Sequence, residues 1–297
     1  MDSGACSASS FSDRPTGFYD AYLLDLDGTV YLGDELLPGA RAAVEELRRR
    51  GIPVRFLSNN PTKDPAQYSE KLTRLGLPTP VDEIVSTVAA MTRWLLVHHP
   101  GATVFPIPER PVIASFEAAG IPMSDDPARI DVVVASYDRT FDYRKLQIAF
   151  DAIWYHRRAI LVATNPDRYC PFPGGRGEPD CAAIVAAIEA CTGTRCQQYT
   201  GKPDPAMVAE ALDGLDVDPR RCMMVGDRLT TDIEMAVRAG MPSALVLTGD
   251  SGIADVRAVP ADRQPTYVLP RIDHVIPATA WQELGWAEDD PTLAKCD

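Results

Sequence analysis

Hydrophobic and polar positions along the chain alternate in a way that favours short buried strands, each followed by an amphipathic helix. Short apolar runs predict strands at Asp20–Leu26, Val54–Leu57, Val104–Ile107, Val132–Ala135, Ile160–Ala163, Cys222–Val225 and Ala244–Leu247. Apolar residues at helical spacing predict helices at Pro38–Arg50, Asp64–Leu75, Tyr143–Tyr155, Cys181–Cys191 and Pro205–Leu212. Such repetition predicts an α/β fold with parallel sheets and right-handed crossovers.

Two segments stand out from this repetition. The Pro- and Gly-rich stretch Pro166–Pro179 predicts a long loop, and loops of that length are commonly functional. In the helix expected at Tyr143–Tyr155, the positions of Trp154 and Tyr155 favour a place in the core.

Polar residues follow directly after three of the predicted strands, beyond Leu24, Leu57 and Val225. In open parallel sheets, ligands bind outside the carboxyl ends of the strands. We therefore expect these three loops to converge on one crevice.

Composition narrows the class of protein. The 297 residues are 45% hydrophobic and 24% charged, as in soluble globular domains, and the net charge is −13. This acidity argues against a nucleic-acid partner, which needs clustered Lys and Arg. The seven cysteines show no metal-ligand spacing, and no apolar run approaches the ~20 residues of a membrane span. Residues 1–17, which are rich in Ser, predict a disordered tail rather than a signal peptide. The expectation is a cytoplasmic protein that does not bind membranes.

Carboxylates dominate two of the polar loops. Asp25-Leu26-Asp27-Gly28 ends the first strand, and Gly226-Asp227 follows a later one, with Asp232 one helical turn further on. Gathering Asp25, Asp227 and Asp232 in one crevice without a cation would cost heavily in repulsion. Hard cations prefer such oxygen ligands, so the pattern predicts Mg²⁺.

The remaining polar loops favour an anionic ligand. Ser58-Asn59-Asn60 closes a strand before a helix, where a hydroxyl and main-chain N–H groups form a natural phosphate cradle. Lys202, held between Gly201 and Pro203, is suited to meet phosphate charge.

The four motifs, in this order, resemble those of the haloacid dehalogenase superfamily. The long insertion between Ser58 and Lys202, together with Val225–Ile233 and Ala163–Asp167, resembles the NagD-like, para-nitrophenyl-phosphatase-like branch. The resemblance implies a Rossmann-like core formed by residues 1–81 and 198–297. It also implies an α/β cap domain inserted at residues 82–197, and it leaves a homodimer through the cap open.

The resemblance further implies a phosphatase that cleaves a small phosphorylated metabolite: a sugar, polyol, glycolate-type or nucleotide phosphate. Asp25 would be the nucleophile and Asp27 the general acid and base. Asp25, the main-chain carbonyl of Asp27 and Asp227 would hold Mg²⁺, with Asp232 in support. Ser58, Asn59, Asn60 and Lys202 would bind the phosphoryl oxygens.

The cap is expected to supply the contacts to the leaving group. Asn165, Asp167 and Cys170 are the candidates for substrate specificity. Pyridoxal-phosphate phosphatases of this branch carry a His where Cys170 stands, which argues against that substrate. A phosphotransferase on the same core, or a phosphate-binding protein without catalysis, remains as an alternative. The acid/base candidate Asp27 argues against a dehalogenase, and the absence of a glycine fingerprint argues against a dinucleotide site.

Overall fold

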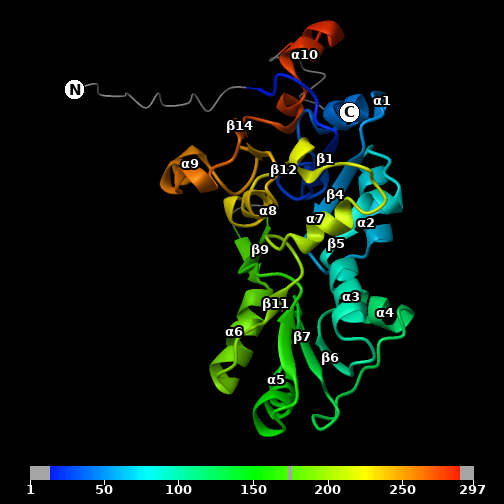
Figure 1. Ribbon diagram of the computed structural model, residues 1–297, viewed down its shortest axis with the longest axis vertical. Coiled ribbons are helices and arrows are strands. Elements are labelled where there is room, and N and C mark those ends of the chain that lie inside the picture. Colours follow the sequence, from blue (N-terminus) through cyan, green and yellow to red (C-terminus); the bar gives the residue numbers. More distant parts are fainter. Residues whose placement is uncertain (1–13, 173–175, 288–297) are drawn as a thin grey trace, which may run out of the picture. The chain divides into compact units, whose positions relative to one another are not determined.

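The computed structural model describes residues 14–172 and 176–287 (Figure 1). Contacts within the chain divide it into two compact units. The first comprises the residues up to Tyr31, Glu35–Val54 and the residues from Asp218 onward, and the second comprises Leu32–Asp34 and Arg55–Val217. Most of the predicted N-terminal tail, residues 1–13, lies outside the described residues. The domain limits expected at residues 82 and 197 stay a prediction.

The first unit contains four parallel strands in the order β14-β13-β12-β1. These strands are β1 (Ala21–Asp25), β12 (Cys222–Gly226), β13 (Ser243–Val246) and β14 (Tyr267–Leu269). Its α-helices are α1 (Ala40–Arg49), α8 (Glu234–Ala239), α9 (Ile253–Ala258) and α10 (Ala278–Leu284). A π-helical turn, η5, covers Leu229–Ile233, and short 3₁₀ turns cover η4 (Pro219–Arg221), η6 (Ala261–Arg263) and η7 (Ile272–Val275).

The strands of the first unit are covered on both faces. Every residue of β1, β12 and β13 is buried, as expected for parallel strands between helical layers. In the pairing of β1 with β12, Leu24 lies beside Val225. The next residues, Asp25 on one strand and Gly226-Asp227 on the other, therefore leave the sheet at the same edge.

The N-terminal segment of the described chain packs on α10. The Arg14 guanidinium lies 4.0 Å from the ring centroid of Trp281, and its Nη2 lies 3.4 Å from Nε2 of His274. Beside them, Asp273 is completely buried and forms an ion pair of 2.8 Å with Arg271. These contacts hold Arg14 against η7 and α10.

The second unit contains a four-stranded parallel sheet in the order β11-β8-β7-β6. Its strands are β6 (Val104–Ile107), β7 (Val132–Ala135), β8 (Ile160–Ala163) and β11 (Gln198–Tyr199). Two further parallel strands, β4 (Val54–Ser58), whose residues from Arg55 onward belong to this unit, and β5 (Ile84–Ser86), pair from Phe56 to Ser58. The short strands β2 (Tyr31–Leu32) and β3 (Glu35–Leu36) pair with each other.

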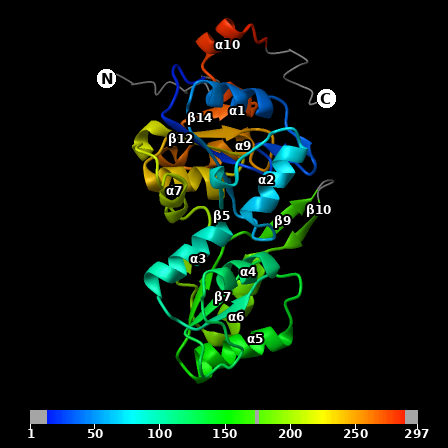
Figure 2. The same ribbon diagram turned by 90° about the vertical axis from the view of Figure 1, so that its right-hand side faces the viewer.

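Helices surround the four-stranded sheet, as Figure 2 shows for α3 to α6 around β7. The α-helices of the unit are α2 (Pro65–Arg74), α3 (Thr87–His98), α4 (Arg110–Ala118), α5 (Tyr143–Phe150), α6 (Cys181–Thr192) and α7 (Ala206–Ala211). A π-helical turn, η2 (Asp151–Tyr155), extends α5, and a 3₁₀ turn, η1 (Val81–Glu83), precedes β5.

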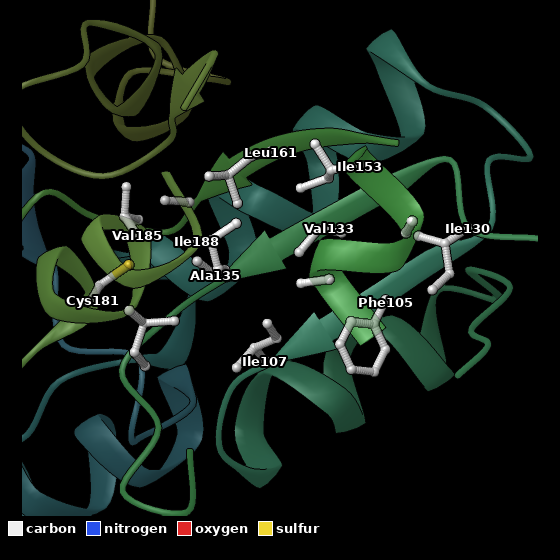
Figure 3. Close-up of a cluster of buried hydrophobic side chains, with 14 residues drawn as sticks. Phe105, Ile107, Ile130, Val133, Ala135, Ile153, Leu161, Cys181, Val185 and Ile188 are labelled. Carbon is white, nitrogen blue, oxygen red and sulfur yellow. The ribbon is translucent and has the colours of Figure 1, made fainter. Parts of the chain in front are cut away.

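Alternate residues of the sheet enter two separate cores. Val133, Ala135, Leu161 and their neighbours pack against α5, η2 and α6 in the cluster drawn in Figure 3. The intervening residues Val132, Val134 and Val162 pack against α3 and α4. Because side chains of a strand point alternately to opposite faces, two apolar cores require continuously apolar strands. The predicted α/β fold with parallel sheets is confirmed.

Two local predictions are wrong. The stretch Pro166–Pro179 is not a loop throughout: it contains the antiparallel strands β9 (Tyr169–Phe172) and β10 (Arg176–Pro179), which pair with each other. Trp154 and Tyr155 do not enter the core, since they are 52% and 70% exposed. They lie in the π-helical turn η2, whose wider spacing carries them away from the apolar face of α5.

No helix among the described residues is long and apolar enough to cross a membrane.

Candidate active site

Three acidic side chains of the first unit gather at the carboxyl edge of its sheet. Asp25 is the last residue of β1, Asp227 follows β12, and Asp232 lies in η5. All three are buried, and each offers a carboxylate oxygen within 4.8 Å of the others. Buried carboxylates so close together repel one another unless a cation is present. The set of hard oxygen donors fits Mg²⁺, which binds through one or two carboxylates and keeps other positions for water and substrate.

Three glycines allow this close packing of the carboxylates. A Cβ on Gly28, whose φ is 91°, would lie 2.5 Å from Oδ2 of Asp227, and one on Gly249 would lie 2.0 Å from the same atom. A Cβ on Gly226 would lie 2.3 Å from Cγ of Asp232. Any side chain at these positions would displace a carboxylate.

Main-chain N–H groups orient two of the carboxylates. The N–H of Asp250 donates to Oδ2 of Asp227 over 2.7 Å, and that of Arg228 donates to Oδ2 of Asp232 over 3.1 Å. Such bonds to an ionised acceptor are the stronger kind of hydrogen bond. The positions of these two oxygens are therefore fixed by the backbone.

The loop Thr248–Ser251, which our sequence reasoning missed, forms hydrogen bonds to the turn at Gly28 and to the main chain of Asp227. Oγ1 of Thr248 donates to the carbonyl of Gly28 over 2.6 Å, and the N–H of Ser251 donates to the carbonyl of Asp227 over 3.0 Å. Thr-Gly-Asp-Ser follows the predicted strand Ala244–Leu247 directly. That position, at the end of another parallel strand, was the signal that could have identified it.

Asp27 differs from Asp25 in its surroundings. It is exposed, whereas Asp25 is 7% exposed. The phenol of the fully buried Tyr31 donates to Oδ2 of Asp27 over 3.0 Å, and the N–H of Gly28 donates to the carbonyl of Tyr31. An exposed carboxylate held by a rigid donor suits a group that exchanges protons with a substrate.

The predicted phosphate-binding residues lie in the second unit. Ser58 ends β4, and its Oγ donates to the hydroxyl of Tyr68 and accepts from the N–H of Asn60. Lys202 is 2% exposed, and the side chain of Asn59 binds both its main-chain N–H and its carbonyl. The structure thus brings Asn59 and Lys202 together, although 143 positions separate them.

The three candidates for specificity contact the same turn. Nδ2 of Asn165 donates to the carbonyl of Asn59 over 3.0 Å, and Oδ2 of Asp167 accepts from Nδ2 of Asn59 over 3.0 Å. Cys170, on β9, has its Sγ 3.7 Å from Nδ2 of Asn60. Asn165 is completely buried, and Cys170 is half-buried.

Comparison with known families agrees with the motifs. Residues 22–122 match the model of the haloacid dehalogenase-like hydrolases, and residues 199–275 match a second, HAD-hydrolase-like model. The acid sugar phosphatase of Staphylococcus aureus is 34% identical over 261 residues, which is 87% of this chain and 97% of that protein.

Solved structures show the same relationship. A 4-nitrophenylphosphatase from Thermotoga maritima superposes with a TM-score of 0.80 at 32% identity, covering 86% of this chain and 96% of its own. A glycerol phosphate phosphatase from Mycobacterium tuberculosis, solved in complex with magnesium, superposes with a TM-score of 0.78 at 31% identity. The match covers 86% of this chain and 77% of that one. NagD from Escherichia coli superposes with a TM-score of 0.77 at 25% identity, and the match covers 86% of this chain and 98% of that one. The predicted fold class, a parallel-sheet core with an inserted α/β cap, is confirmed by these neighbours. The chain belongs to the haloacid dehalogenase-like hydrolases, in their NagD-like branch of phosphatases, and is a phosphoric monoester hydrolase.

Proposed function

We propose that the protein is a magnesium-dependent phosphatase that hydrolyses a small phosphate monoester through an aspartyl phosphate on Asp25. The observation that carries this proposal is the group of three buried carboxylates, Asp25, Asp227 and Asp232, with oxygens within 4.8 Å of one another. The exposed carboxylate of Asp27, two residues from the nucleophile, supports the same reaction.

Asp25, the main-chain carbonyl of Asp27 and Asp227 would hold the ion, with Asp232 orienting its surroundings. When bound, Mg²⁺ neutralises the charge of the nucleophile and of the phosphoryl group. The glycines at 28, 226 and 249 keep the space around these carboxylates free of side chains. A relative solved in complex with magnesium lends the choice of ion further support.

The chain's own carboxylates carry the chemistry. An oxygen of Asp25 attacks phosphorus, the bond from phosphorus to the ester oxygen breaks, and Asp27 gives its proton to the departing alcohol. Water then attacks the phosphoryl group on Asp25, and Asp27 takes a proton from that water. Inorganic phosphate leaves, and both carboxylates return to their first state.

Ser58, the main chain of Asn59, Asn60 and Lys202 are proposed to bind the nonbridging phosphoryl oxygens. Lys202 is buried, and a positive charge at a position shielded from water attracts a phosphoryl group more strongly than one in solvent. Donors directed at oxygens whose charge grows in the transition state lower the barrier more than they favour substrate binding.

The leaving group is proposed to be a sugar or a polyol, ahead of a glycolate-type acid or a nucleotide. Two relatives support this order, because they are described as an acid sugar phosphatase and a glycerol phosphate phosphatase. Cys170 is the side chain that we propose as a contact to this group, whereas Oδ2 of Asp167 accepts from Nδ2 of Asn59.

The test is release of inorganic phosphate from 4-nitrophenyl phosphate and from a panel of sugar, polyol and nucleotide phosphates, with Mg²⁺ and with a chelator. We expect hydrolysis only with Mg²⁺, and none by Asp25→Asn at unchanged thermal stability. Turnover that persists in chelator, at a verified negligible metal content, would refute the proposed dependence on Mg²⁺. Phosphate transfer to an added alcohol in place of release would instead identify a phosphotransferase. Binding of phosphate without turnover would identify a phosphate-binding protein.

A further inference from the structure

The side-chain amide of Asn59 is the centre of a hydrogen-bond network within the second unit. Its Oδ1 accepts from the N–H of Lys202 over 2.8 Å, and its Nδ2 donates to the carbonyl of Lys202 over 2.9 Å. The same Nδ2 donates to Oδ2 of Asp167 over 3.0 Å. The amide of Asn59 thus uses its acceptor and both donors on two distant segments of the chain.

Only an asparagine satisfies these partners. Two acceptors face Nδ2 and an N–H faces Oδ1, so a reversed amide would place like groups against each other. An aspartate would offer no donor to the carbonyl of Lys202 or to Asp167. Gly201 makes the approach close enough, since a Cβ there would lie 2.6 Å from Oδ1 of Asn59 and 2.7 Å from the carbonyl of Thr164.

Asn165 completes the network from the other side. Its Nδ2 donates to the carbonyl of Asn59 over 3.0 Å, and its Oδ1 accepts from the N–H of Asp167 over 2.9 Å. With 0% exposure, this side chain has no surface for a leaving group to contact. Its bonds fix the position of the segment that follows it.

We propose that Asn59 and Asn165 are positioning residues that hold the Lys202 loop and the Asn165–Asp167 loop in one hydrogen-bonded unit. This inference rests on the proposed function, in which Lys202 binds the phosphoryl group. The phosphoryl group is common to every substrate. Loss of the hydrogen bonds of either asparagine therefore lowers activity toward all substrates by the same factor. Cys170 lies outside the network, and its substitution changes the order of substrate preference instead.

The test compares Asn59→Asp, Asn165→Asp and Cys170→Ala with the wild-type chain on several sugar, polyol and nucleotide phosphates. Both asparagine variants are expected to lose ~10–100-fold in kcat/KM, in parallel across the panel. The inhibition constant of inorganic phosphate should rise in both, because the probe contains only the group that Lys202 meets. Cys170→Ala should raise that constant less than either asparagine variant does, while it reorders the substrates.

A charge exchange tests the contact itself. In Asn59→Asp, two carboxylates face each other at positions 59 and 167, whereas adding Asp167→Asn restores a donor between them. The double variant is expected to recover part of the loss in phosphate affinity, which a merely structural role for Asn59 would not produce. If the two substitutions instead lower phosphate affinity independently of each other, the network is refuted.

Gln198→Glu is the matched control. Its Nε2 also donates to a main-chain carbonyl and to a carboxylate, those of Tyr199 and Asp204, but not to Lys202. Urea unfolding should show a comparable loss of stability in this control, with phosphate inhibition unchanged. An active wild-type chain whose asparagine variants reorder substrates, or leave phosphate inhibition unchanged, overturns the inference alone. A wild-type chain that hydrolyses no phosphate monoester overturns the proposed function.

Discussion

The main-chain N–H of Asp250 donates a hydrogen bond of 2.7 Å to the carboxylate of Asp227. An oxygen of Asp227, which we propose as a metal ligand, is thereby oriented by a loop that follows a different strand, β13. The glycine before it, Gly249, is what lets the loop come this near, because a Cβ at that position would lie 2.0 Å from the same oxygen.

Gly249→Ala should therefore weaken Mg²⁺ binding. The methyl group pushes Asp227 out of place, and we expect the concentration of Mg²⁺ that gives half-maximal activity to rise at least ~10-fold, as for the loss of a supporting contact at a metal site. Calorimetric titration with Mg²⁺ measures the same effect without turnover. Gly252→Ala is the control, since its Cβ would meet only Oδ2 of Asp255, at 3.7 Å. Equal Mg²⁺ affinity in both variants would contradict the proposed role of Asp227.

Asp27→Asn should slow turnover most for substrates with poor leaving groups. The amide cannot give a proton to the departing alcohol, a step worth ~10²–10⁴-fold. Nitrophenolate leaves without that proton, so 4-nitrophenyl phosphate should lose less than a polyol phosphate. The measurement is kcat for both substrates in wild type and variant. Equal losses would count against Asp27 as the general acid.

Tyr31→Phe should produce a milder form of the same pattern. It removes the phenol that donates to Asp27 over 3.0 Å and keeps the buried ring. We expect kcat toward a polyol phosphate to fall by about 3–30-fold, as for one hydrogen bond to a charged group in a partly exposed place. Comparison of the pH profiles of wild type and variant shows whether the loss acts through Asp27, since an unchanged profile shape would indicate a packing defect.

His274 should make the fold sensitive to mild acid. Burial, followed by the charges of Arg14 and Arg271, lowers the pKa of His274 from 6.5 to about 4. The folded state therefore resists a proton that the unfolded state accepts, and stability is lost as the pH falls from about 6.5 toward 4. The neighbouring Asp273, whose pKa burial raises, acts in the opposite sense in both wild type and variant. His274→Gln should show a smaller fall of the urea midpoint between pH 7.5 and pH 5; an equal fall would refute this assignment.

Ile188→Ala should lower the free energy of unfolding by about 2–5 kcal/mol, because it opens a cavity in the core drawn in Figure 3. Ile188 is completely buried. Val97→Ala, at a position that is 63% exposed on α3, should change it by no more than about 0.5 kcal/mol. Urea unfolding of both variants measures the difference, and similar losses would contradict the assignment of Ile188 to the core.

The strands that sequence predicts best are those buried on both faces. The bounds expected for Val104–Ile107, Val132–Ala135 and Ile160–Ala163 are the bounds observed. Their unbroken apolar runs follow from two cores on the two sides of one sheet. The hairpin β9–β10 carries no such pattern, because its pairing rests on main-chain hydrogen bonds and its sequence includes Pro and Gly. A π-helical turn also has no recognisable sequence pattern. For that reason the exposed positions of Trp154 and Tyr155, which lie in such a turn, could not be predicted.

The candidate site also contains features that the sequence predicts and features that it does not. The gathering of Asp25, Asp227 and Asp232 follows from where they stand after their strands, which parallel pairing brings to one edge. The role of Tyr31 as a donor to Asp27 was missed because a Tyr among apolar residues is expected to pack in the core. Its hydroxyl reaches Asp27 only because the chain turns between the two residues. The network of Asn59 and Asn165 was missed because its partners are far apart in sequence and meet through tertiary structure. The predictions on partners and on the homodimer stay predictions.

The bonds at Asp167 determine where this protein can be recombined with its relatives. The strands β9 and β10 pair with each other, so a designer can exchange the residues of this pair to graft a new preference. Asn165 and Asp167 belong instead to the recipient scaffold, because Asn59 holds both. A chimera joined at Tyr169 keeps this amide network. One joined at Thr164 replaces Asn165 and Asp167, and its active site keeps this network only where the donor chain has the same residues at these positions.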